Sequence, residues 1–130
     1  MNIHNGKIQS FTDLNVWKEG HKLVIIVYKI TKEFPKEETY SLVDQMRRAA
    51  ASITANITEG FGRQTYKEKA QFYYMSKGSL SELKNFILIA KDVNYLSENN
   101  FKLLVEQENI VDRLLQGFIK KTKIFINQKS

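Results

Sequence analysis

Polar side chains recur at helical spacing between residues 45 and 63, and their types are suited to directed hydrogen bonding. The intervals of three and four residues place them along one face of a helix. This stripe consists of Gln45, Arg48, Ser52, Asn56, Glu59 and Arg63. A solvated helix face is usually rich in lysine and glutamate, whereas amide and guanidinium groups are planar and form oriented hydrogen bonds. The stripe therefore predicts a hydrogen-bonded interface, within a helical bundle or between subunits, with a solvent-facing stripe as the alternative.

Two glutamates, Glu82 and Glu108, fall close to apolar seams of the sequence. A buried carboxylate needs a partner, and arginine pairs with carboxylates through two parallel hydrogen bonds. Arg47 and Arg48 are the candidate partners, so Arg47 and Glu82 join the predicted polar interface. A di-metal site is the alternative, but it requires a Glu-x-x-His motif on two helices and the sequence contains none. We predict no metal site and no cofactor.

The sequence offers few residues for catalysis. It has no cysteine and only two histidines, His4 and His21, which excludes thiolate nucleophiles and sites built from several imidazoles. The glycines at residues 60 and 62 lack the spacing and the lysine of a phosphate-binding loop. An enzyme would need a pocket in which ionisable side chains converge. The candidates for such a pocket are Arg48, Glu59, Arg63 and Glu82. We predict no catalytic residue and a protein that is not an enzyme.

Positive charge is in excess, because 20 lysines and arginines outnumber 14 acidic residues and give a net charge of +6. Such an excess favours an anionic partner such as nucleic acid. The candidate phosphate-binding residues form two groups, Arg63, Lys67 and Lys69 in one and Lys120, Lys121 and Lys123 in the other. Aromatic side chains that can stack on bases are close in sequence to the first group, namely Phe61, Tyr66, Tyr73 and Tyr74. The alternative is that the lysines complement a helix dipole and aid solubility.

The composition is that of one globular domain spanning residues 1–130, with 42% hydrophobic residues, a single proline and six glycines. So few helix breakers favour long helices. Apolar periodicity and capping residues predict four helices, at about 13–34, 41–60, 65–95 and 98–126. The expected caps are Asp13, Ser41, Thr65 with Glu68, and Ser97, and the glycines at 60 and 62 suit a left-handed helix end. Small residues at 49–52 and 76–79 predict close helix–helix approach. The fold class expected is all-α, an antiparallel up-down-up-down four-helix bundle.

No targeting or membrane segment is apparent. The segment Met1–Asp13 is polar, and the longest apolar run, Leu23–Tyr28, is far too short to span a bilayer. We therefore expect a soluble cytoplasmic protein without a membrane partner.

Three motifs, in this order along the chain, carry a family resemblance. They are Phe11-x-Asp13-Leu14-x-Val16-Trp17, then Gln45-Met46-Arg47-Arg48-Ala49-Ala50-x-Ser52-Ile53-x-x-Asn56-Ile57-x-Glu59-Gly60-x-x-Arg63, then Phe72-x-x-x-Ser76-x-Gly78-Ser79-x-x-Glu82. With these motifs the sequence resembles, over about Phe11 to Thr122, the bacterial four-helix-bundle family typified by the protein encoded in intervening sequences of 23S rRNA genes. That family has historically been described as a ribosomal protein.

The resemblance implies a bundle that assembles as a homopentamer. The accessory variability protein of diversity-generating retroelements looks similar in fold and assembly, and it is associated with nucleic acid and a reverse transcriptase. No enzymatic activity is implied for either branch. The leading prediction is a non-enzymatic, oligomeric protein that binds RNA or structured DNA through phosphates, without base-specific readout. The alternative is a protein–protein interaction scaffold or accessory subunit, for example to a reverse transcriptase.

Overall fold

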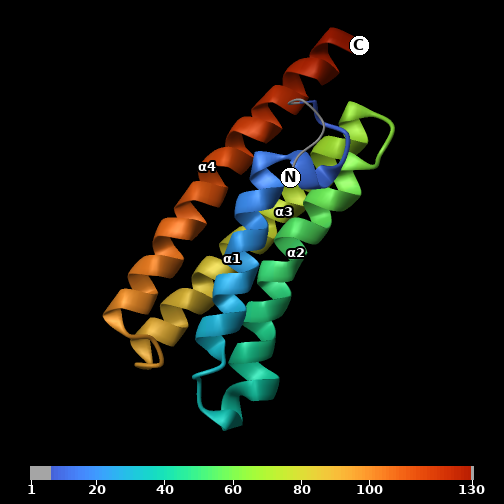
Figure 1. Ribbon diagram of the computed structural model, residues 1–130. Helices are drawn as coiled ribbons and strands as arrows, with labels where there is room; N and C mark the ends of the chain where they lie inside the picture. Colours follow the sequence, from blue (N-terminus) through green and yellow to red (C-terminus); the bar gives the residue numbers. More distant parts are fainter. Residues whose placement is uncertain (1–6, 130) are drawn as a thin grey trace.

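The computed structural model describes residues 7–129, with the side chain of residue 129 excepted, and it consists of helices joined by short loops (Figure 1). Residues 1–6, which include His4 and the start of the expected polar N-terminal segment, lie outside the described part. The four long helices are α1 (Asn15–Thr31), α2 (Asp44–Phe61), α3 (Tyr66–Asp92) and α4 (Glu98–Lys129). Three short helical turns precede α1 and α2, namely η1 (Phe11–Asp13), η2 (Lys36–Glu38) and η3 (Thr39–Val43).

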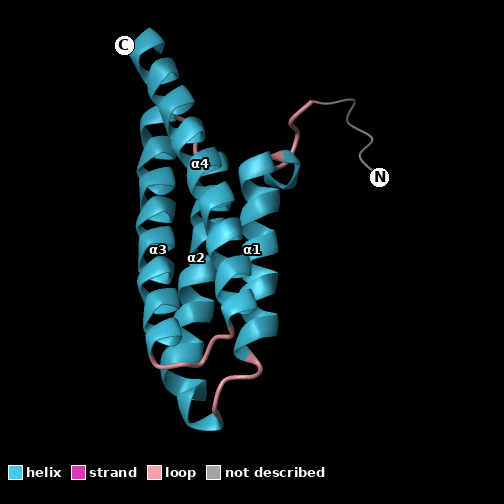
Figure 2. Ribbon diagram, turned by 90° about the vertical axis from the view of Figure 1, so that its left-hand side faces the viewer, coloured by secondary structure: helices cyan, strands magenta, loops and turns pink. Residues whose placement is uncertain are grey.

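The helices form a four-membered bundle in which each one packs against two others. α2 contacts α1 and α3, and α4 contacts α3 and α1, which closes the ring. Figure 1 shows the chain reversing direction at each loop, so that neighbours run antiparallel, and Figure 2 shows the four axes side by side. The α1–α2 and α3–α4 loops consequently lie at one end of the bundle. The α2–α3 loop and the C-terminal part of α4 lie at the other end.

The core is a single cluster, mostly of aliphatic side chains, contributed by all four helices. Its large side chains with 2% exposure or less include Leu23 and Val27 of α1, Met46, Ile53 and Ile57 of α2, Leu80, Leu83 and Ile87 of α3, and Leu104, Val111 and Leu115 of α4. Each fully buried aliphatic side chain contributes about 1.5–3 kcal/mol relative to an exposed one. The core therefore holds the four helix faces in fixed register, and this register decides which polar residues meet.

Two of the four predicted caps are confirmed. The backbone N–H of Glu68 donates to Thr65 Oγ1 over 3.1 Å, and the N–H of Asn100 donates to Ser97 Oγ over 3.0 Å. The predicted cap Asp13 is wrong, since it belongs to a capping box with Ser10 that closes η1. Helix α1 then begins at Asn15, after Leu14, with no side-chain cap.

The predicted helix limits differ from the observed ones by a few residues. The second helix begins at Asp44 rather than at residue 41, because a π-helical turn occupies 39–43 and Ser41 Oγ donates to Glu38 Oε1 over 2.7 Å instead of capping. The first and third helices end three residues early, at Thr31 and Asp92, and the fourth extends three residues further. The chain turns after α3 through Asn94, whose φ of 66° is one that asparagine tolerates.

The glycines play different roles from those expected. Gly62 ends α2 with a right-handed φ of −79°, so the predicted left-handed conformation is wrong. Gly78 does not mediate close approach, because nothing would lie within 4 Å of an added Cβ. Gly20 does pack tightly, since a Cβ there would be 3.1 Å from Thr54 Cγ2 of α2. No helix within residues 7–129 is long and apolar enough to cross a membrane.

Candidate nucleic-acid interface

The middle of the polar stripe on α2 lies against α3, within one bundle. The hydroxyl oxygens of Ser52 and Ser79 are hydrogen-bonded at 2.8 Å. Asn56 Nδ2 donates to the carbonyl oxygen of Ser52 over 2.9 Å, and Ser76 Oγ donates to the carbonyl oxygen of Ile53 over 2.8 Å. Short polar side chains thus find their hydrogen-bond partners among side chains and carbonyl groups at the α2–α3 contact, the most extensive helix contact in the bundle. This part of the stripe holds the fold together.

The two ends of the stripe face solvent. Arg48 pairs with Asp44 of its own helix, Nε to Oδ2 at 3.1 Å, and its side chain is 76% exposed. Arg63 pairs with Glu59 at 3.1 Å and lies over the ring of Phe72. Gln45 is exposed as well. The stripe is therefore divided between an internal hydrogen-bonded centre and exposed ends.

Arg47 joins α2 to α1. Its Nε donates to Thr31 Oγ1 over 3.0 Å, its Nη2 donates to the carbonyl oxygen of Tyr28 over 3.3 Å, and its guanidinium lies 4.6 Å from the centroid of the Tyr28 ring. Thr31 is 2% exposed, so the guanidinium satisfies a buried hydroxyl at the end of α1. This contact makes Arg47 a structural residue within the bundle.

Within one bundle, the glutamates do not pair with these arginines as expected. Glu82 is exposed on α3, and both arginines have the other partners described above. Glu108 is buried on α4, at 5% exposure. Burial raises the pKa of Glu108, a nearby Lys84 lowers it, and the neighbouring Asp112 raises it further. A carboxyl in such surroundings favours its protonated form more than a free one does.

Charge is distributed unevenly between the two ends of the bundle. The end with the α1–α2 and α3–α4 loops, residues 31–44 and 91–98, has six acidic and three basic side chains. The opposite end, residues 61–69 and 113–128, has seven basic side chains and one acidic one. Both predicted phosphate-binding groups belong to this basic end, which the α2–α3 loop and the C-terminal part of α4 form (Figure 1).

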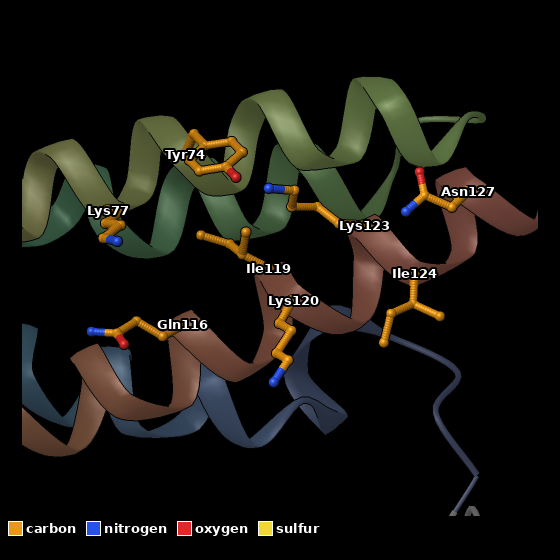
Figure 3. Close-up of a pocket in the computed structure, with 8 residues that line it drawn as sticks. All are labelled: Tyr74, Lys77, Gln116, Ile119, Lys120, Lys123, Ile124 and Asn127. Atoms are coloured by element: carbon orange, nitrogen blue, oxygen red, sulfur yellow. The ribbon is translucent and has the colours of Figure 1, made fainter.

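A groove of about 380 Å³ runs between α3 and α4 at the basic end (Figure 3). We call it the α3–α4 groove. Its lining residues are Tyr74 and Lys77 of α3 and Gln116, Ile119, Lys120, Lys123, Ile124 and Asn127 of α4. Three are lysines and none is acidic. Figure 3 shows Lys123 reaching across toward Tyr74, and its Nζ is 5.9 Å from the centroid of that ring.

A second hollow of about 380 Å³ lies on another side of α4, and we call it the aromatic pocket. Its lining residues are Ile8, Leu14, Phe61, Tyr66, Lys69, Tyr73, Phe118, Lys121, Thr122 and Phe125. Tyr66 of α3 stacks on Phe125 of α4 with ring centroids 5.0 Å apart, and this contact joins the two predicted basic groups.

The predicted basic residues do not form one cluster, because they lie on different sides of the bundle end. Lys120 and Lys123 line the α3–α4 groove, whereas Lys121 lines the aromatic pocket together with Lys69. One residue along a helix is a rotation of about 100°, so neighbours in sequence face different sides. Lys67 is exposed and lines neither hollow.

Sequence reasoning missed Lys77. It stands three residues after Tyr74 on α3, a spacing that places both on one face. This spacing was the available signal, but Lys120 and Lys123 are more than forty residues away in the sequence. Within the described residues, no group of three or more His, Asp or Glu side chains is placed to hold a metal ion.

The family model for the 23S rRNA-intervening sequence protein matches residues 12–117. The chain belongs to this family. The match spans all of α1, α2 and α3 and the first two thirds of α4, so the middle motif with its internal hydrogen bonds lies within it. The three lysines at positions 120, 121 and 123 lie just beyond it.

A solved structure supports the fold of this 23S rRNA-intervening sequence family member. The crystal structure is of a protein from Bacteroides thetaiotaomicron, described as having unknown function and coming from the S23 ribosomal protein family. The TM-score is 0.75 at 17% sequence identity, over 81% of this chain and 95% of that one. This likeness supports the all-α four-helix fold. No curated protein matches the chain.

Proposed function

We propose that this protein is a non-enzymatic, oligomeric nucleic-acid-binding protein that contacts the phosphates of RNA or structured DNA. The observation that carries the proposal is the α3–α4 groove, which Lys77, Lys120 and Lys123 line together with the exposed Tyr74 and which has no acidic lining residue. Lysine ammonium groups bind phosphate as point charges and release condensed counterions from the nucleic acid.

Tyr74 supports contact with unpaired or terminal bases as well as with phosphate. Its side chain is 46% exposed, so part of its ring is free for stacking. Aromatic rings stack on any base, while the lysines contact the backbone. Neither the tyrosine ring nor the lysines are placed to read base edges in the groove of a duplex. We therefore expect binding without base-specific readout. We assign no reaction and no cofactor to the chain. A protein that binds cellular RNA would act in the cytoplasm, and we propose that location.

Self-assembly, with the pentamer that the family resemblance implies, would strengthen this binding. Outside the α3–α4 groove, large apolar side chains stay exposed on the outer sides of α3 and α4, namely Met75, Leu88 and Ile89 on α3 and Leu103 and Ile110 on α4. Apolar exposure on this scale favours contact with another protein surface. Five copies would carry a charge of about +30, and multivalent contact with one nucleic acid raises the apparent affinity.

The same exposed apolar side chains favour a second candidate, a protein–protein scaffold or accessory subunit. Salt dependence separates the two functions. Phosphate binding weakens steeply with salt because counterions are released, whereas an apolar protein interface is little affected.

The full-length protein should therefore be titrated with an RNA stem-loop and with a DNA duplex at several salt concentrations, with its size measured by light scattering in the same buffers. We expect a loss of affinity of about 10-fold or more between 50 and 200 mM salt, since each phosphate contact contributes to the slope. An absence of binding at the lowest salt would contradict the nucleic-acid function and leave the scaffold as the function to test.

A further inference from the structure

The aromatic pocket differs from the α3–α4 groove in the chemistry of its wall. Five of its ten lining residues are aromatic, and they come from α2, α3 and α4. Tyr66 stacks on Phe125, and Tyr73 packs against Phe118 with ring centroids 4.6 Å apart. A hollow walled by rings suits a flat, conjugated ligand, since rings stack on such a ligand and every nucleobase has a π face.

The most buried of these residues brings an unused polar group to the pocket. Tyr73 is 2% exposed, and its hydroxyl forms no hydrogen bond with any described residue. No half-buried or buried residue in the described chain has a fully enclosed side-chain oxygen or nitrogen without a partner. The Tyr73 hydroxyl is therefore not fully enclosed. Burial raises the pKa of this phenol to about 12, so it stays protonated and able to donate near neutral pH. A hydroxyl that is not fully enclosed and has no partner among the described residues is open to a hydrogen bond with water or with a ligand.

Two lysines give the same pocket a preference for an anion. Lys121 is exposed on α4 and has no acidic residue beside it among the lining residues. Lys69 is half-buried, donates from Nζ to the carbonyl oxygen of Phe61 over 2.6 Å and has its pKa lowered by burial. An anion bound nearby would stabilise the charged form of Lys69 and so oppose this effect of burial.

We propose that the aromatic pocket binds one unpaired nucleotide, with the base among the rings and against the Tyr73 hydroxyl and the phosphate at Lys121. This inference deepens the proposed function, on which it rests, by naming single-stranded nucleotides as part of the ligand. The shared chemistry is a flat base joined to a phosphate. A free mononucleotide and an unpaired nucleotide of an RNA strand both supply it. The ring-lined wall favours this ligand over a fatty acid, whose flexible chain gains nothing from stacking.

The experiment uses full-length protein and 2-aminopurine, a base whose fluorescence is quenched when it stacks. Three probes are titrated, namely a single-stranded RNA of about ten nucleotides with 2-aminopurine at its end, the same strand in a duplex that pairs this base, and 2-aminopurine riboside monophosphate. We expect quenching with the single strand and not with the duplex. Quenching of the monophosphate would identify the free nucleotide as a sufficient ligand, and its absence would identify the strand as the source.

Two variants locate the site. Tyr73→Phe removes only the unpaired hydroxyl, so the fold should persist, and we expect affinity for the single strand to fall by about 2- to 10-fold, as for one lost hydrogen bond. Tyr66→Leu keeps apolar bulk at the rim but removes a ring, and we expect a loss of about 5-fold or more. Tyr40→Leu, at the opposite end of the bundle where this tyrosine is 94% exposed, is the matched control and should leave the quenching unchanged.

The outcomes distinguish this inference from the proposed function. Steeply salt-dependent RNA binding without quenching, or quenching that Tyr73→Phe and Tyr66→Leu leave intact, would overturn the pocket and keep the function. Quenching of the monophosphate with no RNA binding would support the pocket and overturn the function. A fluorescent fatty acid that binds and is not displaced by adenosine monophosphate would overturn the choice of ligand.

Discussion

Gly60 of α2 and Tyr73 of α3 lie in direct contact, so close that a Cβ added at residue 60 would be 2.6 Å from Cε1 of the tyrosine. The same atom would be 2.9 Å from Cβ of Phe72. Glycine at this position is thus what allows α2 and α3 to converge at the end of the bundle where the aromatic pocket lies. Helix approach and pocket shape depend on the same pair of residues.

Gly60→Ala should destabilise the protein, although alanine is normally the better helix former by about 1 kcal/mol. The added methyl group would clash with the ring of Tyr73 and with Cβ of Phe72, which have little room to move. Such overpacking costs about 1–3 kcal/mol. Gly78→Ala is the matched control on the neighbouring helix, because nothing lies within 4 Å of its added Cβ. We expect that variant to gain about 0.5–1 kcal/mol. Urea denaturation of both variants checks the pair, and equal effects would show that close packing at Gly60 is unimportant.

Arg47→Ala and Arg48→Ala should differ although the residues are adjacent. Arg47 holds the buried Thr31 hydroxyl and the end of α1, so its loss should cost about 1–2 kcal/mol of stability. Arg48 pairs only with Asp44 at the surface, and its loss should change stability by less than about 0.5 kcal/mol. Urea midpoints measure the difference. A large destabilisation by Arg48→Ala in the monomeric unit would contradict the contacts described here.

Arg48 also tests assembly. Although its Nε pairs with Asp44, its side chain is 76% exposed, with Gln45 on the same face, so it can contact another subunit. If the outer end of the stripe serves the oligomer, Arg48→Ala will reduce the size measured by light scattering without a loss of helix content. An unchanged size would show that the stripe acts only within one bundle.

Glu108→Gln should stabilise the protein at neutral pH. Burial, more than the opposing effect of Lys84, raises the folded-state pKa of Glu108 above its ordinary value of 4.5. The folded state therefore binds this proton more tightly than the unfolded state, and the carboxylate lowers stability once the pH exceeds the folded pKa. The cost disappears as the pH falls toward 4.5 and both states become protonated. Urea midpoints of wild type and variant should thus differ at pH 7 and converge near pH 4. A constant difference would contradict the burial of this charge.

Local signals in the sequence predicted the helices well and their ends less well. The caps at Thr65 and Ser97 depend on residues three positions apart, so the sequence contains all that they need. The start of α2 depends on Ser41 bonding to Glu38 in a π-helical turn, which has no comparable sequence signal. Small errors of this kind do not change which faces are buried.

Helical phase explains the errors at the candidate site. Glu82 was expected close to an apolar seam with an arginine partner, but it is exposed next to the fully buried Leu83, and one residue amounts to about 100° of rotation. The same rotation separates Lys121 from the adjacent Lys120, which lines the α3–α4 groove together with Lys123. Lys77 lies near those lysines because of the way α3 and α4 are aligned with one another. Core packing sets this alignment, and no local sequence pattern encodes it.

The central claim is that the α3–α4 groove binds nucleic-acid phosphates, and a pair of double variants tests it most directly. Lys120→Gln with Lys123→Gln removes two charges from the groove, whereas Lys29→Gln with Lys32→Gln removes two exposed charges from the opposite end of the bundle. Binding of one RNA stem-loop is measured for both over a salt series. The groove variant should bind more weakly, with the slope of log affinity against log salt reduced by about 2, while the control matches wild type. Equal slopes for the two variants would contradict the assignment of phosphate binding to this groove.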